Sequence, residues 1–157
     1  MLPDPLHPAV VHLPIALALL VPLVALFALA AARLGWLSVR GWAFVVLLQA
    51  LLVASGWLAV ETGEAQEERV EKVVAERIID DHHDRAERFL WAAAITLVAI
   101  GAGLAPGRAG SFARPFGFAL SLGVAGLAAD VGHTGGMLVY EHGAASAYTT
   151  EAPPPAP

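Results

Sequence analysis

The 157-residue chain contains no cysteine. Without thiolates it cannot form disulfides, thiolate zinc sites or iron–sulfur clusters, and it cannot attach haem covalently as c-type cytochromes do. Any metal or cofactor must therefore be bound by histidine, carboxylate, methionine or tyrosine side chains. Basic clusters are absent as well. Because nucleic-acid-binding proteins carry such clusters, we expect no nucleic-acid partner.

Charged residues are scarce: they make up 15% of the chain, whereas 57% of it is hydrophobic and the mean hydropathy is +0.66. Soluble domains carry roughly a quarter charged residues, so this composition indicates a membrane protein. Four apolar runs approach the ~20 residues that cross a ~30 Å hydrocarbon core. They are residues 13–32, 42–60, 89–105 and 116–139. We predict an all-α, four-transmembrane-helix bundle with the lipid bilayer as a partner.

The two ends of the chain differ in composition from the apolar runs. The N-terminus lacks the basic segment that opens a signal peptide, so we expect the first run to remain as a span. Residues 1–150 are predicted to form a single four-helix membrane domain. Residues 151–157 are too rich in proline to pack and are predicted to be a disordered tail.

Glycine and proline are missing from residue 64 to residue 100. Because these two residues are the usual helix breakers, we predict one continuous helix here, in which the third span extends into an amphipathic periplasmic segment. Apolar residues recur among its acids and arginines, which is typical of a helix half-covered by protein or by lipid headgroups. The second span is expected to stop before this helix, at residues 61–63.

Acidic residues are absent from two loops, one with Arg33 and Arg40 and the other with Arg108 and Arg114. Cytoplasmic loops typically have this excess of arginine. Both termini are therefore predicted on the periplasmic side of a bacterial inner membrane that the chain crosses several times. Trp36 and Trp42, one at each side of the first loop, are expected to lie at the interface and to anchor the adjoining spans.

Histidine is absent from both arginine loops, so this topology places all six histidines on the periplasmic side. A lone interfacial histidine is usually a hydrogen-bonded structural residue, but six together indicate a site. Asp130, His133, Met137 and Tyr140 are spaced by three, four and three residues and share one face of a helix. Counting from residue 116 at ~1.5 Å per residue puts His133 about 26 Å into the membrane, level with His12. Ionisable residues at such depths are usually functional.

A b-type haem requires only two axial imidazoles from facing helices, and no cysteine. The axial candidates are His12, His133, His83 and His7, with Arg85 and Arg88 as partners of the haem propionates. Helix periodicity favours His83 over His82 as the inward-facing residue. Haem b at the periplasmic end, acting in electron transfer, is the first hypothesis.

A second hypothesis is a copper, zinc or iron site. The candidate ligands are then His7, His12, His83, His133, His142, Asp130 and Glu61. Two Asp-x-x-His pairs are similar to the Glu-x-x-His pairs of di-iron bundles, which keeps a carboxylate-bridged dimetal site open. In a third hypothesis the histidines only form hydrogen bonds, and the protein is a structural accessory subunit of a membrane complex. No nucleophile with an oriented base is evident, so a self-contained enzyme is not expected.

Two motifs resemble a known family. LHPAVVHLPIAL at residues 6–17 and GHTGGMLVYEHG at residues 132–143 resemble the bacterial membrane-protein family called domain of unknown function 2231, although Leu13 stands where the family usually has Phe. The resemblance implies a four-span protein. Because relatives are joined to Rieske or c-type cytochrome modules, it also implies respiratory electron transfer. The expected partner is a periplasmic cytochrome c, a Rieske-type protein or a larger membrane complex.

Overall fold

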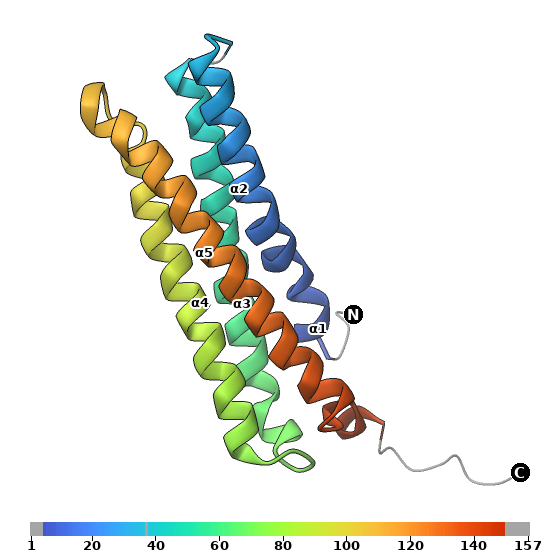
Figure 1. Cartoon of the computed structure of the whole chain (residues 1–157). Coiled ribbons are helices and arrows are strands. Elements are labelled where there is room, and N and C mark those ends of the chain that lie inside the picture. The colour runs from blue at the N-terminus through green and yellow to red at the C-terminus, as the bar shows by residue number, and fades with distance from the viewer. Residues whose placement is uncertain (1–4, 37, 150–157) are drawn as a thin grey trace, which may run out of the picture.

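The computed structural model describes residues 5–36 and 38–149, and the predicted disordered tail at 151–157 lies outside them. The elements are α1 (His7–Val10), α2 (His12–Arg33), η1 (Val39–Gly41), α3 (Trp42–Val70), α4 (Glu76–Ala102), α5 (Gly107–Tyr140) and η2 (Ala144–Tyr148). The four long helices α2 to α5 lie side by side in an antiparallel bundle (Figure 1). No strand is found in the described ranges, so the predicted all-α class is confirmed.

Three stretches of helix are long and apolar enough to cross a membrane: His7–Arg33, Trp42–Val70 and Gly107–Tyr140. The chain is therefore a membrane protein with several apolar helices, as predicted. The remaining long helix, α4, has an apolar part only from residue 89 to 102, about 21 Å at the helical rise. That part packs against α3 and α5, and a fourth crossing stays a prediction.

The prediction of one continuous helix from residue 64 to residue 100 is wrong. The helix of the second apolar run, α3, continues past Gly63 to Val70, and α4 begins only at Glu76 after a turn. Val74 lies in that turn and is buried in a small cluster with Ile79 and Ala144. Burial of these side chains stabilises a chain reversal that helix propensity alone does not show, because no glycine or proline marks it.

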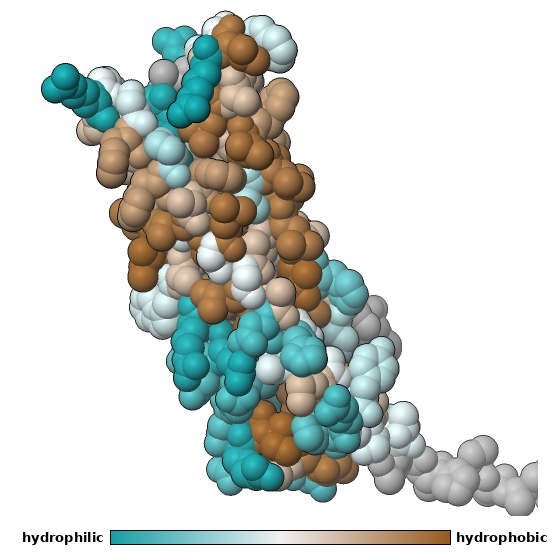
Figure 2. All heavy atoms as spheres, viewed as in Figure 1, coloured by the Kyte–Doolittle hydropathy of each residue, from teal (hydrophilic) through white to brown (hydrophobic). Residues whose placement is uncertain are grey.

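The bundle is longer than a membrane is thick. The 29 residues of α3 and the 34 residues of α5 correspond to about 43 and 51 Å, against a hydrocarbon core of about 30 Å. Hydrophilic side chains gather at the end that carries both termini, and apolar ones cover most of the rest (Figure 2). We call residues 5–12, 61–88 and 130–149 the polar cap, and the other described residues the apolar region.

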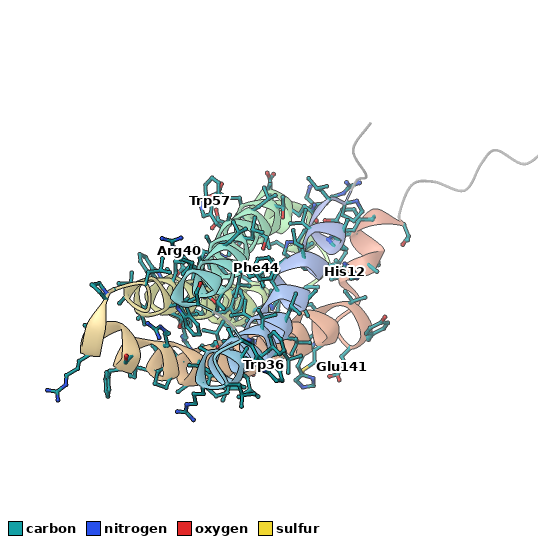
Figure 3. The ribbon with its side chains drawn as sticks, turned by 90° about the horizontal axis from the view of Figure 1, so that it is seen from above. His12, Trp36, Arg40, Phe44, Trp57 and Glu141 are labelled. Atoms are coloured by element: carbon teal, nitrogen blue, oxygen red, sulfur yellow. The ribbon has the colours of Figure 1, made fainter. Side chains whose placement is uncertain are left out.

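Polarity changes at a similar level on neighbouring helices. From Arg33 back to His12 is about 32 Å along α2, and from Arg108 to Asp130 is about 33 Å along α5. Trp57 lies one turn before the cap on α3 and is 58% exposed on the outer surface of the bundle (Figure 3). An exposed tryptophan is common where a helix leaves the hydrocarbon core.

Trp42 is not an interfacial anchor, contrary to the prediction, because its side chain is only 3% exposed. Its indole Nε1 donates to the backbone oxygen of Ile100 at 2.8 Å, which joins the start of α3 to the end of α4. Gln49, deeper in the apolar region, joins the same two helices by donating to the Ala93 oxygen at 2.8 Å. These bonds pair polar atoms that lipid could not satisfy.

Candidate functional site

The polar cap contains all six histidines, and they lie in different environments. His12 on α2 and His133 on α5, the two most embedded histidines in the sequence-based prediction, are both exposed on the outer surface. The other four are partly buried: His7, His82, His83 and His142. Of these, His7 and His82 are held by direct hydrogen bonds to other helices.

His7 begins α1 and reaches across to α3. Its Nδ1 lies 2.8 Å from the backbone oxygen of Ala59 and 3.4 Å from the hydroxyl of Thr62. A carbonyl oxygen only accepts, so Nδ1 must carry a proton, and in the neutral ring Nε2 is then the unprotonated nitrogen. The ring lies against Gly63, where an added Cβ would come within 3.2 Å of it.

His82 on α4 is held in the same way by α5. Its Nδ1 lies 2.8 Å from the Thr134 hydroxyl, which itself donates to the Val131 oxygen at 3.0 Å. With the single hydroxyl proton in the bond to Val131, His82 Nδ1 is the donor, and in the neutral ring Nε2 is then the unprotonated nitrogen. A glycine again makes room for the ring: a Cβ on Gly135 would lie 3.2 Å from the His82 Cε1. Gly135 therefore leaves room for this imidazole.

Electrostatics keep His82 neutral at physiological pH. Burial first, and then the charge that His7 and His83 carry when protonated, lower the pKa of His82 to about 4. A neutral imidazole with Nδ1–H bonded to a protein acceptor is the usual state of a histidine that ligates a metal through Nε2. Within residues 5–36 and 38–149, no hydrogen-bond partner is found for the Nε2 of His7 or of His82.

Sequence reasoning favoured His83 and left His82 out of its candidates. In the structure His83 faces α3, where its Nε2 lies 3.8 Å from a Glu64 carboxylate oxygen, and His82 faces α5. The signal for His82 was present in the sequence, because His82 shares a helical stripe with Arg85 and Phe89. Phe89 is 6% exposed and Arg85 bonds α5, so this stripe is an inward one.

Arg85 joins two carboxylates. Its Nη1 donates to both oxygens of Asp130 on α5, at 3.0 and 2.8 Å, and its Nε donates to Asp81 one turn earlier on α4 at 2.9 Å. Asp130 therefore pairs with an arginine of the neighbouring helix. Arg88, also predicted to bind a propionate, lies 3.5 Å from Asp84 and is largely exposed.

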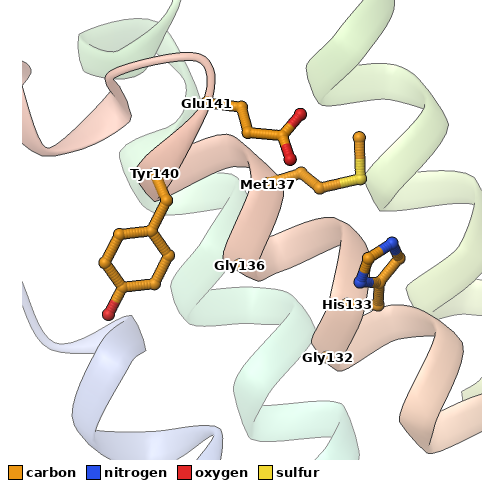
Figure 4. A pocket seen from close by; sticks show the side chains of 6 residues that line it. All are labelled: Gly132, His133, Gly136, Met137, Tyr140 and Glu141. Carbon is orange, nitrogen blue, oxygen red and sulfur yellow. The ribbon is translucent and has the colours of Figure 1, made fainter.

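His133 lines a shallow surface hollow on α5 of about 310 Å³, together with Gly132, Gly136, Met137, Tyr140 and Glu141. In Figure 4 His133, Met137 and Glu141 project from one side of the helix, and Tyr140 from the other. Glu61 is exposed on α3. In the part of the chain that the structure describes, no three histidine or carboxylate side chains come together in a way that could hold a metal ion.

These observations define an all-helical membrane protein with a histidine-bearing polar cap at one end of its bundle. A family model described as "Predicted membrane protein (DUF2231)" matches residues 3–147, and the chain belongs to that family, as its two motifs predicted. Neither the curated proteins nor the solved structures gave a match.

Proposed function

We propose that the polar cap binds haem b between His7 and His82 and that the protein transfers electrons at the membrane surface. The observation that carries this proposal is the shared state of the two rings. Each ring has Nδ1 at 2.8 Å from an oxygen of another helix, which favours a neutral ring with Nε2 free to ligate, and the two rings come from different helices. Bound haem would supply one-electron iron chemistry, for which the protein provides axial ligands and surroundings.

The donor set favours haem over a bare ion. A porphyrin provides four of the ligands to iron, so two imidazoles complete the coordination. A structural or catalytic zinc site, by contrast, takes three or four protein ligands. No such group of three histidines or carboxylates is found within the described ranges. A copper, zinc or iron ion remains the second candidate, and it would need a further ligand drawn in from the cap.

In this proposal α4 is a fourth span, and the polar cap with both termini lies on the periplasmic side of a bacterial inner membrane. The two loops at the opposite end contain arginines and no acid. The segment from residue 61 to 88 carries ten acidic and five basic residues. A periplasmic cytochrome c, a Rieske-type protein or a larger membrane complex would receive or deliver the electrons, and the acidic surface suits a partner with a basic one.

Optical spectra of the purified protein, oxidised in air and then reduced with dithionite, test the proposal. A haem band that sharpens and shifts on reduction is expected, with about one iron per chain by elemental analysis. Copper or zinc without a haem band would support the second candidate. A protein with neither haem nor metal would sink both and favour the purely structural role.

A further inference from the structure

One residue of α3, Gln66, ties the first helical segment of the chain to the last. Its side-chain oxygen accepts from the backbone N–H groups of Leu6 and His7 at 3.0 and 3.2 Å, and its nitrogen donates to the Tyr148 hydroxyl at 3.0 Å. The partners dictate this orientation of the amide, because backbone N–H groups only donate. Gln66 thus connects the start of α1 with η2.

The helix that carries His7 depends on such a tie. α1 is the first turn of a helical stretch that continues through Val11 into α2, and the first turn of a helix is the part that frays most readily. Its first N–H groups have no partner within the helix, and Gln66 supplies an acceptor for two of the N–H groups at this end. The His7 ring can reach the Ala59 oxygen only while α1 is held against α3.

The C-terminal segment is fixed firmly enough to hold Gln66 in turn. The Nε of Arg69 donates to the Ala147 oxygen at 3.2 Å, and the Arg69 guanidinium lies 4.6 Å from the centre of the Tyr148 ring. The chain reaches this position because Gly143, with φ of +72°, turns it back after α5. Ala144 then packs into the cluster at the turn between α3 and α4.

We propose that Gln66 is a positioning residue for His7, and that η2 controls it through Tyr148. While Tyr148 holds the amide, α1 is capped, His7 keeps its proton on Nδ1, and Nε2 is presented as a ligand. Release of η2 lets α1 fray, and His7 loses its fixed tautomer. The role of Nε2 as a ligand rests on the proposed function. The contacts of Gln66 with α1 and Tyr148 do not depend on a cofactor.

Ring-nitrogen NMR of protein labelled with ¹⁵N-histidine, in detergent micelles, tests the proposal directly. The His7 signals are assigned by their loss in His7→Gln. In the unmodified protein His7 should show one tautomer with the proton on Nδ1. Gln66→Ala should remove that single-tautomer pattern, whereas Gln66→Glu, which still offers acceptor oxygens to both backbone N–H groups, should retain it. The signals of exposed His133 serve as the internal control and should not move.

Tyr148→Phe keeps the ring over Arg69 but loses the hydroxyl, so it should shift the His7 signals in the same direction as Gln66→Ala, by less. If Gln66→Ala fails to fold, Tyr148→Phe alone tests whether η2 acts on His7 through Gln66. Unchanged His7 signals in Tyr148→Phe and in folded Gln66→Ala would overturn the proposal, as would a Gln66→Glu protein that behaves like Gln66→Ala. A protein without haem or metal would overturn the proposed function and leave the tautomer result intact.

Discussion

The apolar region and the polar cap are held together by different kinds of contact. In the apolar region helices come close at small residues, and buried polar side chains bond to backbone oxygens. Gly117 lies so close to Ile100 that an added Cβ would come within 2.8 Å of the Ile100 Cγ1 and 3.2 Å of its Cα. Trp42 and Gln49 donate to carbonyl oxygens of α4. These contacts depend on close steric fit, so larger side chains should not be tolerated at these positions.

In the polar cap, side chains of different helices bond to one another. Arg85 of α4 pairs with Asp130 of α5, and His82 of α4 bonds Thr134 of α5. Most of these groups are only partly buried, so water, protons and salt can reach them. We therefore expect fold stability to depend chiefly on the apolar region, and we expect the cap to be the part that responds to pH and salt.

The largest effect should come from labelling the two ends of the bundle, which the proposed topology places on opposite sides of the membrane. The chain has no cysteine, so single cysteines can be introduced without background. In intact cells with a permeable outer membrane, a membrane-impermeant maleimide should label Ser146→Cys in the cap and leave Ser38→Cys, in the loop before α3, unlabelled. After cell lysis the maleimide should label both cysteine variants. Labelling of Ser38→Cys alone in intact cells would show that the protein has the opposite orientation in the membrane.

Overpacking the apolar region should cost the most stability. Gly117→Ala places a methyl group against Ile100 and should lower the free energy of unfolding by about 1–3 kcal/mol. Gly123→Ala on the same helix meets nothing within 4 Å and is the matched control, with stability equal or slightly raised. Thermal unfolding in detergent, followed by circular dichroism, measures both. Equal losses for the two variants would contradict the close packing of α5 on α4.

Acid should weaken the cap through His82. Its pKa is lowered to about 4 in the folded protein but is ~6.5 in an unfolded chain, so the unfolded state binds more protons between these values. Stability from this group is therefore complete above about pH 6.5 and declines as the pH falls towards 4. Unfolding midpoints at pH 7.5, 6.5 and 5 should fall less in His82→Gln than in the unmodified protein. His133→Gln, on the exposed surface, should keep the original slope.

The smallest effect should come from the ion pairs. Asp130→Asn removes the carboxylate that links Arg85 to α5 and should cost up to about 1 kcal/mol, because the pair is only partly buried. The loss should shrink as salt is added. Asp84→Asn removes the partner of Arg88 within α4, where both side chains are more than 60% exposed, and should change nothing measurable. Unfolding midpoints at low and high salt compare the two variants.

The sequence was sufficient for the class of fold, because apolar runs of membrane length leave few alternatives. It was insufficient for the turn at residues 71–75, since burial of Val74 in a cluster with Ile79 and Ala144 decides it. Depth along a helix likewise says nothing about rotation, which is why His12 and His133 were favoured although both are exposed.

The hydrogen-bond and ion-pair partners in the polar cap also could not be predicted from the sequence. Asp130 was expected beside a metal or an imidazole, but it pairs with Arg85. Gln66 carried no signal at all, because its role depends on two segments that are distant in the chain, α1 and η2. Helical periodicity did place His82 on the stripe of Phe89, and giving that buried aromatic more weight would have identified the residue.

The haem content of four single variants tests whether His7 and His82 bind haem. His7→Ala, His82→Ala, His12→Ala and His133→Ala are purified alike, and iron per chain and the reduced absorption band are measured against the unmodified protein. We predict loss of the band in the first two and retention in the last two, because Nδ1 of His7 and of His82 bonds another helix, whereas His12 and His133 are exposed. Loss of the band with His12 and His133, and its survival without His7 and His82, would contradict it.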